Sequence, residues 1–550
     1  MKAAELLVRC LENEGIEIIF GVPGEENADM MLALEGSSIR FVLTRQEQGA
    51  AFMADVYGRL TGNPAGALST LGPGASNLIT GVANANLDRS PMVVLTGQGE
   101  STRQHKESHQ IMDVIGMFEP VTKWSQTIRH PDAIPELVRK AVRLARMEKP
   151  GAVMLELAED IAKHEVDLEP MSVHRFERPR PSDAALGRAV SCLRRAKRPI
   201  IIAGNGTLRK NASDALRQLC EETKIGAIST FMGKGVVDVD SPQCLYTIGL
   251  QSRDHTAVAV ENSDLVVAIG YDMVEYPPAL WNAVAGQRKI LHIDFEQAEI
   301  DSHYHPDVEL VGDIAGSLEL LLKHLKIEGI PNYDLDYQRQ TREKMQDELK
   351  EHHDDTDHTP VRPQKILWDL REALGPDDIV LSDVGAHKMW VARHYHCHQP
   401  NTCLIPNGFC SMGFALPGAI AAKMVHPDRN VVAVCGDGGF LMNVQEMETA
   451  NRLNTAVVVL VWEDFGYGLI EWKQDAEFGQ HSDLAFGNPD WVQLAESFGW
   501  HGKRVEASSG VLPAITEALA NSKPTLIVVP VDYRENLKLT ERLGNIRGSL

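Results

Sequence analysis

Short apolar runs alternate with longer amphipathic stretches along the first 160 residues of the chain. The apolar runs, rich in Val, Ile, Leu and Ala, cover residues 16–20, 39–43, 65–69, 92–96 and 152–155. Strands of a parallel sheet give such runs because helices cover both faces of the sheet, and the stretches between the runs have helical spacing. This segment is therefore predicted to be an α/β unit with a parallel sheet.

The same alternation returns twice further along the chain. A Pro- and charge-rich linker at 176–183 precedes a second block, and a polar connector at 328–363 precedes a third block that runs to about residue 531. Strands of the second block are predicted at 199–203, 226–229, 265–269 and 289–293. A chain of 550 residues is too long for one core. We expect three doubly wound parallel-sheet domains, at 1–170, 184–328 and 360–540.

Composition and charge narrow the classes of function. Hydrophobic residues make up 43% of the chain and charged residues 24%, and no apolar run approaches the ~20 residues of a membrane span. A net charge of −22 argues against nucleic acid as a partner, since binding to it relies on Lys and Arg. The acidic, helical N-terminus lacks signal-peptide features, and the eight cysteines show no paired spacing. We expect a cytoplasmic protein with reduced thiols and no membrane partner.

The chemistry is concentrated in the third block, where two apolar runs end in acidic residues. The run at 430–434 leads into a glycine-rich turn, and the run at 457–462 is followed by Asp464. The turn consists of Gly436, Asp437, Gly438 and Gly439. Backbone amides at a strand-to-helix turn can face phosphate oxygens, and two carboxylates suit Mg²⁺. A glycine-rich turn alone is more often a simple chain reversal.

Together with Glu463-Asp464 after the next strand, this turn resembles the thiamine diphosphate (ThDP) motif of the 2-oxoacid decarboxylase and acetolactate synthase superfamily. Asp at the second position of the pair resembles the motif of the FAD-independent acetolactate synthases, which also have Asp there. The resemblance implies an N-terminal pyrimidine-binding domain, a Rossmann-like central domain and a C-terminal diphosphate-binding domain. It assigns Mg²⁺ to Asp437, Asp464 and Gly466, and the cofactor to the three glycines of the turn, His387 and Tyr467.

Glu47 is the expected catalytic residue. It follows a predicted strand and begins a small-residue helix, where an isolated Glu is usually a helix N-terminal charge. The segment from Glu47 to Ala54 resembles the superfamily stretch whose glutamate bonds N1′ of the aminopyrimidine. A carboxyl buried against an apolar ring can share a proton with that nitrogen. Gln46 stands where the family more often has His.

Further segments carry the same resemblance. The turns that contain Gly24 and Gly74, with Asn77 expected to start a helix, are similar to cofactor-facing turns. Met412 is expected to wedge the cofactor into its bent shape, and the carbonyl of Cys410 to accept from its 4′-amino group, with the thiol as a small packing group. His109 and Gln110 resemble substrate-side residues, although capping of a surface helix explains them equally well.

Three other patterns are weaker. The His- and Asp-rich residues 350–358 are interpreted as a solvated helix end and loop. Residues 393–398 are interpreted as an element with His and Tyr on opposite faces, and a zinc site there is the less favoured interpretation. The turn after residue 203 is Gly-rich but lacks a matched acidic residue. Residues 270–278 resemble the FAD-free enzymes, so FAD is not expected.

The resemblance implies decarboxylation of a small 2-oxo acid with carboligation, most simply 2 pyruvate to 2-acetolactate plus CO₂. A decarboxylase that converts 2-oxoglutarate to succinic semialdehyde is the alternative within the superfamily. A non-catalytic scaffold or regulatory relative is the alternative of another class. Because superfamily members bind ThDP between subunits, a homodimer or homotetramer is expected.

Overall fold

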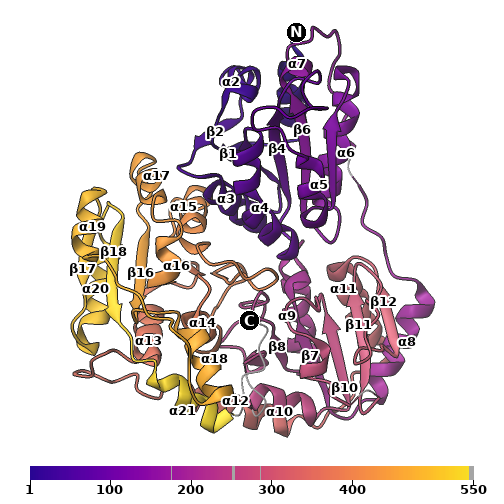
Figure 1. Ribbon diagram of the computed structural model, residues 1–550. Helices are drawn as coiled ribbons and strands as arrows, with labels where there is room; N and C mark the ends of the chain where they lie inside the picture. The colour runs from indigo at the N-terminus through magenta and orange to yellow at the C-terminus, as the bar shows by residue number, and fades with distance from the viewer. Residues whose placement is uncertain (175, 251–253, 285, 544–550) are drawn as a thin grey trace.

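A computed structural model describes residues 1–174, 176–250, 254–284 and 286–543. The chain forms three parallel six-stranded sheets, each flanked by helices (Figure 1). The expectation of three doubly wound parallel-sheet domains is confirmed. Within the described residues, no helix is long and apolar enough to cross a membrane.

The N-terminal domain has the strand order β2-β1-β3-β4-β6-β5. Its strands are β1 (Ile18–Gly21), β2 (Arg40–Leu43), β3 (Ala65–Ser69), β4 (Met92–Gln98), β5 (Trp124–Ile128) and β6 (Ala152–Ala158). Its helices are α1 (Ala3–Asn13), α2 (Ala28–Glu35), α3 (Glu47–Thr61), α4 (Gly72–Leu87), α5 (Val114–Phe118), α6 (Ile134–Arg146) and α7 (Glu159–Ala162). Strand β5 was not predicted, because this edge strand is only half buried and carries polar residues.

The central domain has the order β12-β11-β10-β7-β8-β9. Its strands are β7 (Pro199–Ala203), β8 (Ala227–Ser229), β9 (Cys244–Thr247), β10 (Leu265–Ile269), β11 (Lys289–Asp294) and β12 (Val308–Val311). Its helices are α8 (Asp183–Arg195), α9 (Ala212–Thr223), α10 (His255–Glu261) and α11 (Ile314–Glu328), and α12 (Asp336–Leu349) crosses the connector. The two outer strands, β9 and β12, were not predicted; each contains polar or half-buried residues and lacks a continuous apolar run.

The C-terminal domain has the order β14-β13-β15-β16-β18-β17. Its strands are β13 (Ile379–Ser382), β14 (Cys403–Leu404), β15 (Val431–Gly436), β16 (Val458–Glu463), β17 (His501–Arg504) and β18 (Thr525–Pro530). Its helices are α13 (Pro363–Ala373), α14 (Ala386–His394), α15 (Ala415–Val425), α16 (Asp437–Leu441), α17 (Glu446–Arg452), α18 (Gly468–Phe478), α19 (Trp491–Ser497), α20 (Val511–Leu519) and α21 (Arg534–Leu543).

The two terminal domains share one topology, since each sheet places its strands in the chain order 2-1-3-4-6-5. In both sheets strands 1 and 3 are neighbours. The strand order changes direction between them, because strand 2 lies beyond strand 1 and strand 4 lies beyond strand 3. Ligands of open α/β sheets bind at the carboxyl ends of strands beside such a switch in strand order. The ends of β1 and β3, and those of β13 and β15, are therefore equivalent candidate ligand edges.

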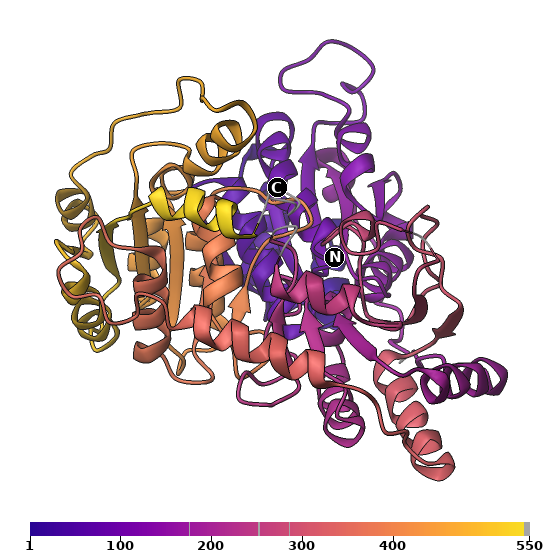
Figure 2. The same cartoon turned by 90° about the horizontal axis from the view of Figure 1, so that it is seen from below.

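Helices α3 and α15 join the two terminal domains into one core. Phe52 and Phe414 meet edge to face, with ring centroids 5.7 Å apart. Gly418 permits the approach, because a Cβ at this position would lie 2.9 Å from Cγ2 of Val56. In Figures 1 and 2 the N-terminal domain contacts both others, and α3 lies at the boundary with the C-terminal domain in Figure 1.

One predicted element is wrong. Residues 393–398 were expected to alternate, but Arg393 and His394 form the last turn of α14 and the next residues are irregular. The apolar spacing of that segment is helical from Ala386 onward, and Tyr395 is fully buried where the helix ends. The alternation of His and Tyr in the sequence was therefore coincidental. Residues 350–358 form turns after α12, in agreement with the expected helix end and loop.

Candidate active site

A cavity of about 100 Å³ lies at the carboxyl ends of β13, β15 and β16. It is lined by Val384, Gly385, Ala386, His387, Met412, Gly436, Asp437, Gly438, Gly439, Asp464, Gly466, Tyr467, Gly468, Leu469, Ile470 and Tyr533. The nine residues of this group that the sequence assigned to metal or cofactor thus lie together. All lining residues belong to the C-terminal domain, and we call this set the C-terminal half-site.

Asp437 is almost fully buried and is held by several N–H groups. Its Oδ2 accepts from the backbone of Phe465 at 2.8 Å and of Asp464 at 3.2 Å, and from Nδ2 of Asn488 at 2.8 Å. Its Oδ1 accepts from the backbone of Gly438 at 2.8 Å. These contacts fix the carboxylate between the turn after β15 and the segment after β16. Asn488 was not predicted, because it follows a stretch without a recognisable motif.

Asp464 lies beside Asp437 at the cavity. Burial and the neighbouring Asp437 raise the pKa of Asp464 to about 8. Two crowded carboxylates are costly to ionise together, and a divalent cation removes that cost. Hard carboxylate oxygens are also the donors that Mg²⁺ prefers. The donor set therefore fits a divalent metal ion.

His387 provides a second polar group in the cavity. Its side chain is 2% exposed, and Nε2 has no hydrogen-bond partner within the described residues. Burial lowers the pKa of His387 to about 3, so the ring is neutral and one of its nitrogens can donate. A buried polar atom without a partner is unusual and indicates a missing ligand. Nε2 therefore faces the space that a cofactor would fill.

Met412 and Cys410 lie in the segment that leads into α15. The buried carboxylate of Asp383 accepts from the backbone of Gly413 at 2.9 Å and of Ala415 at 3.3 Å, and so fixes the chain next to Met412. Burial raises the pKa of Asp383 to about 6. Cys410 has φ +61°. The thiol of Cys410 was expected only to fill space, but it lies 2.7 Å from Nζ of the buried Lys388.

Glu47 is the first residue of α3 and is 7% exposed. Gln46 caps the helix, since its side chain accepts from the backbone of Gln48 at 3.0 Å. Nδ2 of Asn77 donates to Oε2 of Glu47 at 3.0 Å. Gly74 leaves room for the carboxylate, because a Cβ there would lie 3.1 Å from Oε1 of Glu47.

Gly24 belongs to the same region. A Cβ on Gly24 would lie 2.5 Å from Cβ of Thr70, so only glycine permits this contact between the ends of β1 and β3. Gly72, Pro73 and Gly74 form the first turn of α4, with Asn77 inside the helix and not at its start as predicted. Proline suits that first turn, because its missing N–H has no partner there. Gly24, Glu47, Gly74 and Asn77 are called the N-terminal half-site.

His109 and Gln110 lie in the segment between β4 and α5. Both are exposed in the single chain, and Gln110 has φ +58°. The backbone of Gln110 passes close to Gly72, where a Cβ would lie 2.6 Å from its carbonyl oxygen. The two side chains are therefore near the start of α4. The helix that follows them, α5, is capped by Asp113, whose Oδ1 accepts from the backbone of Gly116 at 2.8 Å.

Among the described residues, all those that line the C-terminal cavity belong to the C-terminal domain, so the N-terminal half-site of the same chain does not contribute to it. A hollow of about 580 Å³ adjoins this cavity and shares Gly438 and Tyr467 with it. Apolar side chains are exposed in this region of the C-terminal domain: Phe409, Met442, Phe465, Tyr467 and Ile470. Clustered exposed apolar groups indicate a surface that another chain or a ligand covers.

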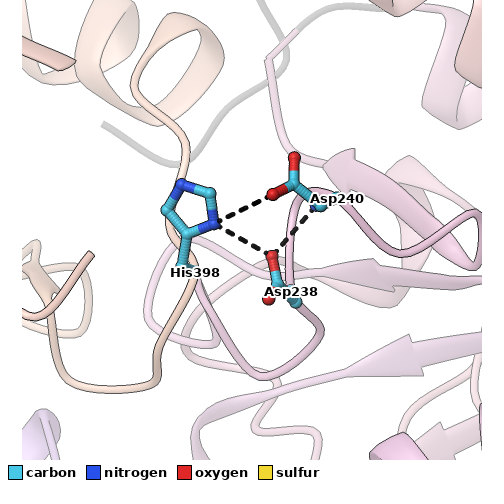
Figure 3. Close-up of side chains that lie close together, drawn as sticks. All are labelled: Asp238, Asp240 and His398. Carbon is cyan, nitrogen blue, oxygen red and sulfur yellow. Dashed lines mark hydrogen bonds and ion pairs between the residues drawn. The ribbon is translucent and has the colours of Figure 1, made fainter. Parts of the chain in front are cut away.

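A separate group of possible metal ligands lies where the central and C-terminal domains meet (Figure 3). Nδ1 of His398 is 3.1 Å from Asp238 and 3.5 Å from Asp240. The side chain of Asp240 is 82% exposed, and Arg217 donates to the carbonyl oxygen of His398 at 2.7 Å. A solvated ion-pair group with an arginine nearby explains these contacts. It lies apart from both half-sites.

Comparison with known proteins adds independent information on the whole chain. Family models described as thiamine pyrophosphate enzyme domains match all three sheets. The N-terminal TPP binding domain matches residues 1–117, the central domain 186–321 and the C-terminal TPP binding domain 383–529.

Similar curated proteins extend over nearly the full length of the chain. An acetolactate synthase of Bacillus subtilis is 34% identical over 547 residues, which cover 98% of this chain and 94% of that protein. A catabolic acetolactate synthase of Raoultella terrigena is 33% identical, with 98% and 97% covered. The large subunit of acetolactate synthase isozyme 2 of Escherichia coli is 31% identical, with the same coverage.

Proposed function

Because the chain belongs to the acetolactate synthase family of thiamine pyrophosphate enzymes, we propose that it condenses two pyruvate molecules to 2-acetolactate and CO₂ with ThDP and Mg²⁺. The observation that carries the proposal is the pairing of Glu47 with Asn77 in a protein that also places Asp437 beside Asp464. A relative that had lost its activity would have no need to retain both arrangements.

Each part of the cofactor has residues that suit it. Asp437, Asp464 and the carbonyl of Gly466 would hold Mg²⁺. Backbone amides of the turn at 436–439 would donate to the diphosphate, with the ring of His387 beside it. Bound ThDP supplies an acidic carbon that adds to the keto carbon of the substrate and accepts the electron pair left by CO₂.

The protein's own groups would control protons and water. Glu47 is buried beside Asn77, which occupies Oε2, so its carboxyl can hold a proton at the free Oε1 against N1′ of the aminopyrimidine. Asn77 orients the carboxylate through Oε2. Met412, together with the apolar groups around the cavity, excludes water from the reacting carbon. His109 and Gln110 would contact the substrate carboxylate.

We propose that FAD is not required. The glycine turn after β7, which holds phosphates in dinucleotide-binding sheets, is occupied by a side chain of the protein itself. Oε1 of Glu275 accepts from the backbone of Asn205 in this turn at 2.8 Å. A Cβ on Gly204 would lie 2.5 Å from the carbonyl oxygen of Gly270, which follows β10. The space between β7 and β10 is therefore filled by backbone and a carboxylate.

A homo-oligomer, dimer or tetramer, completes the proposal. Each cavity of the C-terminal half-site would receive the N-terminal half-site of another copy, which also covers the exposed apolar side chains. We assign the enzyme to the cytoplasm, where all eight cysteines, free in the structure, would stay reduced.

The test is a product analysis with purified protein, ThDP and Mg²⁺, without FAD. Pyruvate and 2-oxoglutarate are supplied in separate reactions while CO₂ is followed. We expect 2-acetolactate from pyruvate. Release of succinic semialdehyde from 2-oxoglutarate, without acetolactate from pyruvate, would instead identify a decarboxylase. Failure to bind ThDP with Mg²⁺ would favour a non-catalytic relative.

A further inference from the structure

Glu446 makes a buried contact between the C-terminal domain and the beginning of α3. It is the first residue of α17, and its side chain is completely buried. Oε1 accepts from the backbone N–H of Arg45 at 3.1 Å and of Gln46 at 3.2 Å. These residues lie 401 and 400 positions away along the chain. The carboxylate thus binds the two residues that immediately precede Glu47.

The contact is closely fitted. Thr449, one turn further along α17, donates from Oγ1 to Oε2 of Glu446 at 2.6 Å. On the opposite side, a Cβ at Gly49 would lie 2.7 Å from Oε1. The carboxylate is therefore held between α17 and α3 with no space for a larger group. A glycine at position 49 of the first turn of α3 is a requirement of this contact.

The geometry at the start of α3 depends on such acceptors. The first backbone N–H groups of a helix have no acceptor within the helix. Buried backbone N–H groups in the turn before the helix also need a hydrogen-bond acceptor. Gln46 caps α3 with its side chain, while its backbone N–H binds Glu446. Fixing residues 45 and 46 fixes the Cα position of Glu47, whose side chain then reaches Asn77.

We propose that Glu446 is a positioning residue for Glu47, holding the turn before α3 so that the Glu47 carboxylate is presented at the N-terminal half-site. This inference rests on the proposed function, in which Glu47 acts on the aminopyrimidine. A displacement of about 1 Å at a catalytic group can cost about 100-fold in rate, so control of this turn matters for activity. Glu446 itself touches neither cofactor nor substrate.

The charge of Glu446 adds to this role. Burial raises the pKa of Glu446 to about 7, although the N–H groups of Arg45 and Gln46 and the hydroxyl of Thr449 oppose the shift. Glu448 on the same helix raises the pKa further, and Arg452 pairs with Glu448. Arg45 and Glu47 are the charged residues on either side of Gln46 in the chain. Charge-assisted hydrogen bonds are about twice as strong as neutral ones. The two backbone contacts are therefore strongest when the carboxylate is ionised.

Three variants of the full-length holoenzyme test the inference. Glu446→Ala removes both contacts, whereas Glu446→Gln keeps an oxygen that can accept from both N–H groups without charge. Glu448→Gln is the matched control, because the same change is made two residues away on α17, where the side chain pairs with Arg452. Size-exclusion chromatography and circular dichroism first establish that each variant is folded and assembled like the wild type.

The deciding measurement is the rate at which enzyme-bound ThDP exchanges its thiazolium C2 proton for deuterium. For Glu446→Ala we expect a fall of about 10- to 100-fold, with ThDP affinity unchanged. Glu446→Gln should lose less and should remove a pH dependence near 7 in the wild-type rate. Glu448→Gln should match the wild type in maximal rate and should keep the pH dependence, moved to lower pH because Glu448 helps to raise the pKa of Glu446.

A fourth variant, Gly49→Ala, keeps the test decisive if Glu446→Ala fails to fold. Gly49→Ala pushes the carboxylate away without altering it and should also slow the exchange. If Glu446→Ala and Gly49→Ala both bind ThDP and exchange at the wild-type rate, the inference is wrong. If the wild-type holoenzyme itself fails to accelerate C2 exchange over free ThDP, the proposed function is wrong instead, so the two failures are distinguishable.

Discussion

Asn77 donates a hydrogen bond to Glu47 across 3.0 Å, and this contact joins the second turn of α4 to the first residue of α3. The two helices follow different strands of the N-terminal sheet, β3 and β2. The position of the Glu47 carboxylate is therefore fixed by the amide of Asn77 and by the N-terminus of α3, to which Glu47 belongs. A buried carboxylate with one fixed partner is suited to proton transfer at its free oxygen.

Replacement of Glu47 by Gln should abolish most of the activity. Gln preserves the contact with Asn77 through its carbonyl oxygen but cannot exchange a proton. General acid–base groups contribute about 10²- to 10⁴-fold, so we expect a fall in kcat of that size, with ThDP affinity within a few-fold of wild type. Steady-state kinetics and calorimetric titration with ThDP measure the two quantities. Equal kcat values would exclude Glu47 as the proton-transfer group.

Asn488→Ala should weaken metal binding. Asn488 donates to Oδ2 of Asp437 at 2.8 Å and so orients a proposed Mg²⁺ ligand without binding the metal. Loss of such a supporting contact costs about 10- to 100-fold in metal affinity. Titration of the metal-free protein with Mg²⁺ at saturating ThDP, followed by tryptophan fluorescence, measures the shift. Asn63→Ala, at an exposed position of the N-terminal domain, is the control. An unchanged Mg²⁺ affinity would show that this contact does not support a metal ligand.

Two inactive variants should restore each other when mixed. Glu47→Gln damages only the N-terminal half-site, and Asp437→Asn only the C-terminal one. If each site combines half-sites of two chains, a mixed dimer has one intact and one doubly damaged site. Random exchange of chains should then recover about a quarter of wild-type activity. Activity of the mixture after dissociation and reassembly measures this. No recovery despite confirmed chain exchange would place both half-sites in one chain.

The stability of the protein should fall with rising pH because of a buried acidic pair. Nδ2 of Asn84 donates to Asp55 at 2.8 Å and to Asp88 at 3.4 Å. Burial, and then the nearby Asp88, raise the pKa of Asp55 to about 7, far above its ordinary value. Between about pH 4 and pH 7 the folded state keeps a proton that the unfolded state has released, so the free energy of unfolding falls through this window.

Asp55→Asn should reduce this pH dependence, because the amide resembles the protonated acid. The Tm of the wild type should drop more between about pH 5 and about pH 8 than that of the variant. Thermal unfolding followed by circular dichroism at both pH values gives the comparison. Asp132→Asn, whose side chain is 69% exposed, should behave like the wild type. Parallel Tm changes in Asp55→Asn and wild type would contradict the assignment.

The sequence by itself determined the architecture and most of the C-terminal half-site. Runs of β-branched residues with helical stretches between them can only be buried as parallel strands covered on both faces, which fixed the three sheets. Asp437 and Asp464 were identifiable because each follows a predicted strand, whereas His387 and Met412 were assigned through the resemblance of their segments to the superfamily. Strand ends of one sheet converge in space, so local sequence sufficed.

Only the tertiary structure decided which groups support these residues. Glu446 and Asn488 lie in segments with no motif of their own, and their importance comes from contacts with residues distant in the chain, Arg45 and Asp437. The separation of the two half-sites within one chain also depends on how whole domains pack. Local spacing encodes helices, strands and turns, but the pairing of a carboxylate with a distant N–H depends on the packing of the entire chain.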